Sequence, residues 1–133
     1  ANRSDSKENV VRGLHFHHRQ FDYWLTPMGQ IRVALCDLRA SSKTFMAVEM
    51  VEMSGDRMCG LLIPPGVAHG FVALMDSTVN YIVNNYYDGE DEHGVAWDDP
   101  ELSVPWGMKS ALISSRDSSN PRFRELPTHL RPG

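Results

Sequence analysis

The chain has only two cysteines, no long apolar run and no excess of positive charge. Cys36 and Cys59 are too few for a disulfide framework, and both lie in apolar stretches, so we expect two small buried side chains. No stretch is long and apolar enough to cross a bilayer, and the polar start ANRSDSKENV is unlike a signal peptide. The 13 basic and 17 acidic residues give a net charge of −4, which argues against nucleic acid or an anionic membrane as a partner. These shortages predict a cytoplasmic protein with no nucleic-acid partner and no membrane association.

The sequence also lacks any long apolar pattern with the period of a helix. It has instead a series of short, apolar or alternating stretches separated by clusters of Gly, Pro, Asp and Ser. These stretches are VVRGLHFH, QIRVALCDLR, TFMAVEMVEM, MCGLLIPPGVAHGFVAL (broken at Pro-Pro-Gly) and TVNYIVNNYY. The pattern favours one all-β domain over residues 1–133, either a sandwich or a small barrel. The segment from Trp106 to Gly133 looks irregular, and we expect it to wrap around the barrel.

One segment, RGLHFHHRQFDYW at residues 12–24, holds three of the six histidines. On a strand, His15 and His17 would point to the same face. Four residues separate His17 from Asp22 and six separate Asp22 from Gly29, a spacing similar to the first motif of the cupin β-barrels. The stretch PPGVAH, ending at His69, is similar to the second cupin motif. This resemblance implies a cupin-type jelly-roll barrel in which His15, His17, Asp22 and His69 converge, a ligand set that suits a divalent transition metal.

Five blocks of the sequence, in order, look like the dTDP-4-dehydrorhamnose 3,5-epimerase family. They are NRSDSKENVVRGLHF, GQIRVALCDLR, IPPGVAHGF, YYDGEDEHGVAWDDPEL and ISSRDSSNP, and together they span nearly the whole chain. The resemblance implies a homodimeric jelly-roll isomerase of dTDP-rhamnose biosynthesis that binds a nucleotide-diphospho 4-keto-6-deoxy sugar without a cofactor. Family members carry a further N-terminal segment, with an Arg and a Glu that help to hold the nucleotide, and we expect this chain to start after it.

Epimerisation beside a ketone needs a base for the C–H proton, an electrophile for the enolate oxygen and an acid on the opposite face. By the resemblance, the base is His15, paired with Asp117, and the opposite acid is Tyr81. This pairing is chemically sound, because a carboxylate fixes the tautomer of an imidazole and stabilises the imidazolium. Other positions match the family's substrate pocket, with two arginines near the diphosphate: Asn2, Arg12, His69, Glu92, Arg116 and Tyr87, with Tyr86 as the alternative tyrosine.

The chain departs from the family at the electrophile. The resemblance places the family's catalytic lysine where this chain has Asp22, and a carboxylate there would repel an enolate. His17 stands where the family commonly has Gln. The two changes together restore the metal-binding cupin pattern, so a metal on His15, His17, Asp22 and His69 could replace the lysine as Lewis acid. That hypothesis conflicts with a free base, because His15 cannot do both.

Three functions remain open from the sequence. The first is a sugar-nucleotide epimerase or related isomerase, the second a metal-dependent cupin enzyme acting on a small carbonyl or sugar substrate, and the third a binding protein that kept the pocket but lost catalysis. Simpler interpretations stand beside them: His17 and His18 are solvated, Asp22 is an exposed loop carboxylate, and His69 caps the barrel mouth.

Overall fold

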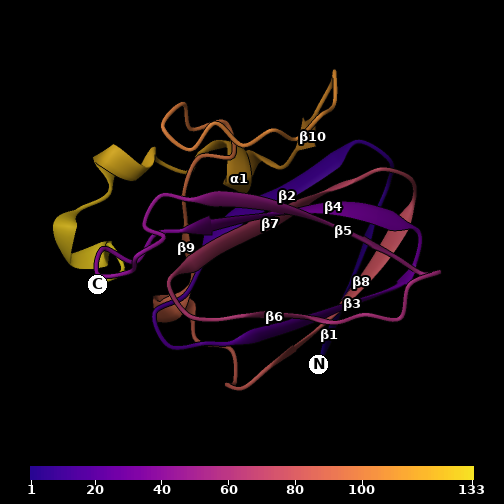
Figure 1. Ribbon diagram of the computed structural model, residues 1–133, viewed down its shortest axis with the longest axis horizontal. Coiled ribbons are helices and arrows are strands. Elements are labelled where there is room, and N and C mark those ends of the chain that lie inside the picture. The colour runs from indigo at the N-terminus through magenta and orange to yellow at the C-terminus, as the bar shows by residue number, and fades with distance from the viewer.

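A computed structural model describes residues 1–133. It has two facing β-sheets (Figure 1), which confirms the predicted all-β, jelly-roll architecture. The four-stranded sheet has the order β1 (Asn2–Ser6), β8 (Ser77–Val83), β3 (Asp22–Met28), β6 (Leu61–Ile63). The other has the order β10 (Leu112–Ile113), β2 (Val10–Phe16), β7 (Val67–Ala73), β4 (Gln30–Asp37), β5 (Val48–Ser54), and β9 (His93–Gly94) also pairs with β2. None of the helices could span a membrane.

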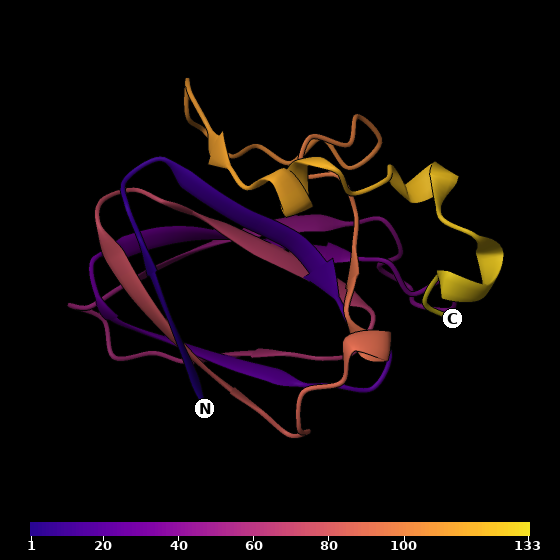
Figure 2. The same cartoon turned by 180° about the vertical axis from the view of Figure 1, so that it is seen from behind.

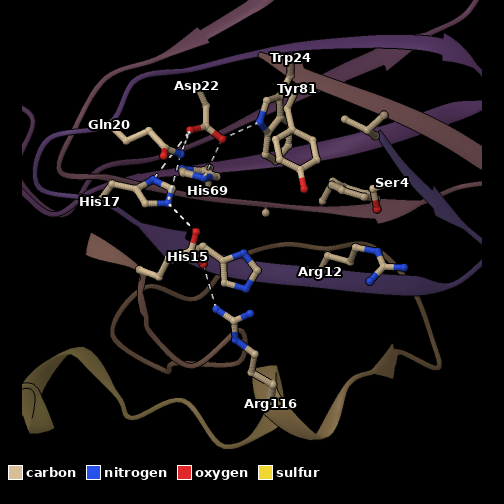
Figure 3. A pocket seen from close by; sticks show the side chains of 14 residues that line it. Ser4, Arg12, His15, His17, Gln20, Asp22, Trp24, His69, Tyr81 and Arg116 are labelled. Carbon is tan, nitrogen blue, oxygen red and sulfur yellow. Dashed lines mark hydrogen bonds and ion pairs between the residues drawn. The ribbon is translucent and has the colours of Figure 1, made fainter. Parts of the chain in front are cut away.

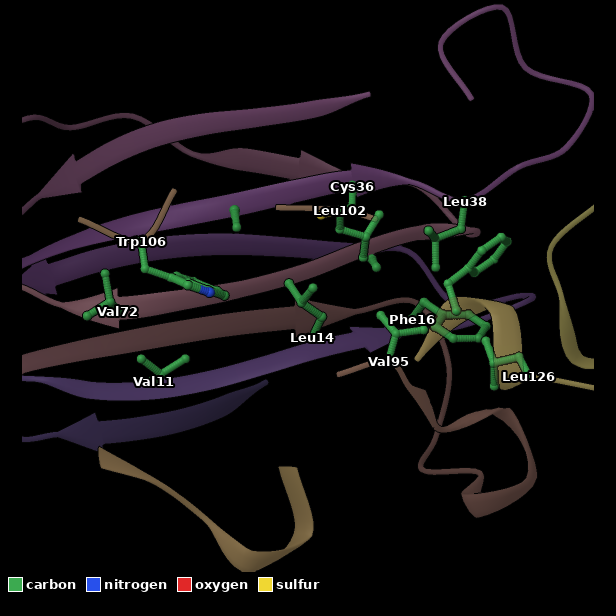
Figure 4. Packing of buried hydrophobic residues seen from close by; sticks show 13 residues of the cluster. Val11, Leu14, Phe16, Cys36, Leu38, Val72, Val95, Leu102, Trp106 and Leu126 are labelled. Atoms are coloured by element: carbon green, nitrogen blue, oxygen red, sulfur yellow. The ribbon is translucent and has the colours of Figure 1, made fainter. Parts of the chain in front are cut away.

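The end of the chain lies over the outer face of the larger sheet (Figure 2), as predicted. It carries α1 (Ser115–Ser118) and two short 3-10 helices, Phe123–Glu125 and Thr128–Leu130; a third, Gly89–Asp91, precedes β9. Phe123 and Leu126 from this segment pack with Leu14 and Phe16 of β2 in one buried cluster (Figure 4). A second cluster, which includes Trp24, Phe71 and Val79, lies between the sheets. The larger sheet is therefore covered on both faces, which explains why every residue of β7 is buried.

Two local predictions from the sequence were wrong. Cys36 is buried in β4, but Cys59 is exposed, because the polar turn SGDR ends the preceding strand and the next strand begins only at Leu61. The strand expected over TFMAVEMVEM begins at Val48, because residues 41–46 form turns and Met46 has a positive φ of 67°.

Two glycines let β2 and β7 approach closely behind the site. A Cβ atom on Gly70 would lie 2.5 Å from the Arg12 carbonyl oxygen and 3.1 Å from Gly13 Cα. Gly13 has φ +132°, and a Cβ there would lie 2.7 Å from Gly70 Cα. The pairing of these strands also shifts between Arg12 and His15, after which His15 pairs with His69. The strands β2 and β7 thus touch through Gly13 and Gly70, and beyond this contact their register places His15 beside His69.

We expect Gly70→Ala to lower the free energy of unfolding by about 1–3 kcal/mol, because the new methyl group meets backbone atoms that cannot rotate away. Urea unfolding followed by circular dichroism measures this. Gly133→Ala is the matched control, since a Cβ there meets nothing within 4 Å. If Gly70→Ala unfolds with a free energy within about 0.5 kcal/mol of the wild type, β2 and β7 do not approach each other as closely as described.

Candidate active site

A cavity of about 270 Å³ opens between the two sheets (Figure 3). It gathers most of the side chains singled out from the sequence, namely Arg12, His15, His17, Asp22, His69, Tyr81, Glu92 and Arg116. Four of the residues singled out do not line it. Asp117 is buried behind His15, Asn2 is exposed on β1, and Tyr86 and Tyr87 are 98% and 83% exposed in the loop after β8. No lysine lines the cavity, so its positive side chains are the two arginines together with any protonated histidine.

The two walls carry different chemical groups because they come from different sheets. Arg12 and His15 project from β2 and His69 from β7, all in the larger sheet. Asp22 projects from β3 and Tyr81 from β8, both in the four-stranded sheet. The Tyr81 hydroxyl points into the cavity towards the wall that carries His15 (Figure 3). A substrate between the sheets would therefore have an imidazole on one side and a phenol on the other.

His15 forms a close pair with Asp117, which lies 102 residues further along the chain. Its Nε2 is 2.6 Å from Oδ1 of Asp117, while Oδ2 accepts a 3.1 Å hydrogen bond from the Gly13 backbone N–H. Asp117 is buried in α1, and its own N–H donates to the capping hydroxyl of Ser114. Burial acts to raise the pKa of Asp117, but the contacts with His15 and Gly13 and the charge of Arg116 outweigh it and hold this pKa below its usual value. The partner of His15 is thus an ionised carboxylate at neutral pH.

A second group of titratable side chains, His17, Asp22 and His69, lies deeper in the cavity. All three are buried, and each offers one ligand atom within 4.8 Å of the others. Burial lowers the pKa of His69 to about 4, with partial compensation from Asp22. The sequence predicted four converging ligands; His15 lies outside this group of three and is bonded to Asp117 instead. The deep position of Asp22 also differs from the simpler interpretation of an exposed loop carboxylate.

Two residues that hold Asp22 in this deep group were missed from the sequence. Gln20 Nε2 donates to Oδ1 of Asp22 at 2.7 Å, and Trp24 Nε1 donates to Oδ2 at 3.2 Å. The period of two along a strand could have found Trp24, since it shares a face with Asp22. Gln20 precedes the strand, and no pattern in the sequence marks it.

Charged groups also line the mouth of the cavity. Arg116 donates to Glu92 at 3.1 Å from an exposed position. Arg12 Nε donates to the Ser6 hydroxyl at 2.8 Å, and its Nη2 donates to the Asp5 carbonyl at 3.1 Å. No carboxylate pairs with Arg12, so its charge is available to an anionic ligand.

Two facing sheets with a polar cavity between them define a jelly-roll protein of the cupin type. The sequence profile of one family, described as dTDP-4-dehydrorhamnose 3,5-epimerase, matches residues 1–125. The chain belongs to this family.

Individual relatives agree with this assignment. The dTDP-4-dehydrorhamnose 3,5-epimerase of Methanothermobacter thermautotrophicus is 35% identical, over 97% of this chain and 73% of the relative. The spore coat polysaccharide biosynthesis protein SpsL of Bacillus subtilis is 37% identical, over 82% of this chain and 75% of its own. The structure of dTDP-6-deoxy-D-glucose-3,5-epimerase RmlC from Legionella pneumophila, in complex with dTDP-4-keto-L-rhamnose, superimposes with a TM-score of 0.92 at 29% identity, over 98% of this chain and 72% of that one.

Proposed function

We propose that this protein epimerises a nucleotide-activated 4-keto-6-deoxy sugar by exchanging a proton at a carbon next to the ketone. The observation that carries the proposal is the His15–Asp117 pair, which faces Tyr81 across the cavity. Family membership supports the same chemistry, and the Legionella relative binds a sugar of this class.

His15 acts as the base in this proposal. A carboxylate can only accept a hydrogen bond, so Nε2 of His15 carries the hydrogen that points to Asp117. Nδ1 then holds the lone pair that removes the proton from carbon, while the C–H electron pair moves to the ketone oxygen to form an enolate. Asp117 stabilises the imidazolium that results. No redox step is involved, so the reaction needs no electron-carrying cofactor.

Tyr81 completes the inversion from the other wall. Its hydroxyl donates a proton to the opposite face of the planar enolate, and the ketone re-forms. Arg12 and Arg116 bind the diphosphate, because guanidinium groups match phosphate oxygens in charge and geometry. Glu92 orients Arg116. Asn2 and Tyr87, outside the cavity lining, are assigned to the nucleotide by resemblance alone.

Solvent-deuterium exchange tests this function. The purified chain is incubated with dTDP-4-keto-L-rhamnose in D₂O, and deuterium next to the ketone is followed by NMR and mass spectrometry. We expect deuterium to enter faster than in a protein-free sample. His18→Ala is the control variant, since His18 lies outside the cavity and contacts Phe16 and His93. Tight binding of the sugar nucleotide without any exchange would overturn the catalytic proposal and favour a binding protein.

We also infer that the protein is a homodimer, as the resemblance implies. The outer face of the four-stranded sheet supports the dimer, because exposed apolar side chains adjoin there in register: Tyr23 pairs with Leu62 on one side and with Ile82 on the other.

Sedimentation velocity tests the dimer. We expect twice the chain mass of 15.0 kDa for the wild type, and partial dissociation for Leu62→Glu, which places a charge in the proposed contact. Met75→Glu changes an exposed apolar residue outside this face and serves as the control. A monomer at every protein concentration would contradict the inference.

A further inference from the structure

We propose that His17, Asp22 and His69 bind one divalent transition-metal ion, at a site separate from the His15–Asp117 pair. The three side chains are buried and come from three places in the chain: the residue directly after β2, the start of β3 and the middle of β7. They meet beside the cavity, so an ion held there would have free coordination positions towards a bound substrate (Figure 3).

The first support is the buried carboxyl group of Asp22. The only nearby side chains able to carry a positive charge are the two histidines, with His17 Nδ1 3.8 Å from Oδ1 and His69 Nε2 3.8 Å from Oδ2. Both distances are too long for hydrogen bonds. The donors that do reach this carboxylate, Gln20 and Trp24, are neutral. A buried carboxylate is normally paired with a positive charge or bound to a metal, and Asp22 has neither a lysine nor an arginine.

The second support is the orientation of the His69 imidazole. The Nδ1 atom of His69 lies 3.0 Å from the Val67 carbonyl oxygen, which can only accept, so Nδ1 carries a hydrogen. In the neutral ring the lone pair is then on Nε2, the atom that faces Asp22. A histidine whose far nitrogen donates to a backbone carbonyl is the usual arrangement of a metal ligand. His17 turns its Nδ1 towards Asp22, and its Nε2 lies 3.4 Å from Nε2 of Gln20 and 3.7 Å from Oε1 of Glu92.

The third support is the spacing of the donor atoms. Two ligand atoms bound at about 2.1 Å to one ion can lie up to about 4.2 Å apart. The two separations of 3.8 Å, one to each oxygen of Asp22, fall within this limit. The group as a whole lies within 4.8 Å, so an ion would draw the three side chains slightly together. Two imidazole nitrogens and one carboxylate oxygen suit first-row ions such as Zn²⁺, Co²⁺ and Fe²⁺ rather than Ca²⁺ or Mg²⁺, which prefer oxygen ligands alone.

This assignment removes the conflict between metal binding and base catalysis. His15 remains free to act as the base because it is not one of the three ligands. Binding of the ion does not depend on the proposed function; its role in catalysis does. In that role the ion supplies positive charge near the enolate oxygen, where the resemblance expects a lysine and the cavity has none.

The test is metal binding itself. The protein is stripped with a chelator, titrated with Co²⁺ and followed by the visible absorption of the bound ion, and Zn²⁺ content after dialysis is measured by mass spectrometry. We expect about one ion per chain, and affinity at least about ten-fold weaker in His17→Ala and Asp22→Asn. Asp22→Asn keeps the size of the side chain, and circular dichroism checks that both variants fold.

Two controls distinguish this site from other arrangements. His18→Ala, at the adjacent histidine outside the group, should bind the ion as the wild type does. His15→Ala should also bind it normally, whereas the four-ligand pattern expected from the sequence predicts a weakened site. Fewer than about 0.1 ion per wild-type chain, or unchanged affinity in folded Asp22→Asn, would overturn the proposal. Metal binding without deuterium exchange would support this metal site and reject the epimerase function. Deuterium exchange at the full rate in metal-free protein would support the epimerase function and reject a catalytic role for the ion.

Discussion

His15→Ala should slow deuterium exchange into dTDP-4-keto-L-rhamnose by about 10²–10⁴-fold, the usual contribution of a general base. The variant loses the only imidazole that is both paired with a buried carboxylate and exposed to the cavity, since the side chain of His15 is 34% exposed while those of His17 and His69 are 7% and 5% exposed. Initial rates of exchange at saturating substrate measure the effect.

Asp117→Asn tests the same pair in a different way. In the wild type one carboxylate oxygen accepts from Gly13 N–H and the other faces Nε2 of His15. The backbone donor should hold the amide oxygen of an asparagine, which turns the amide N–H₂ towards His15. Nε2 must then accept, the hydrogen moves to Nδ1, and the lone pair that removes the substrate proton is lost. We expect a rate loss comparable with that of His15→Ala. Exchange at the wild-type rate in either folded variant would show that the base lies elsewhere.

The sequence predicted the class of fold well because alternating apolar residues and short turns are local signals. The pairing of β2 with β7, which sets His15 beside His69, depends on backbone contact at Gly13 and Gly70 and cannot be derived from local pattern. Asp117 was assigned through the family resemblance alone, since 102 residues separate it from His15.

The metal pattern shows a different limit of the sequence. Alternation places His15 and His17 on one face, which correctly predicts that both line the cavity. It does not reveal that His15 is drawn towards Asp117 in α1 while His17 turns towards Asp22. Tertiary contacts decide which carboxylate each of these two histidines approaches. Here they pair His15 with Asp117 and leave the other three predicted ligands as one group.

Tyr81→Phe should separate the two halves of the proposed reaction. The hydroxyl of Tyr81 is on the wall opposite His15, so its loss should leave proton removal intact and prevent protonation of the far face. His15 can still return a solvent-derived proton to the face from which it came. We therefore expect deuterium incorporation within a few-fold of the wild-type rate, but formation of the epimer slower by about 10²–10⁴-fold.

NMR of the sugar in D₂O distinguishes these outcomes, because loss of a C–H signal reports exchange while a change in coupling constants reports inversion. Tyr23→Phe is the matched control: it removes only a hydroxyl on the outer face of the neighbouring strand β3, away from the cavity, and keeps the apolar ring of the proposed dimer contact. Epimer formation at the wild-type rate in Tyr81→Phe would exclude this residue as the acid. Loss of exchange together with inversion would instead place Tyr81 in proton removal, so the ratio of the two rates assigns its role without depending on the size of either.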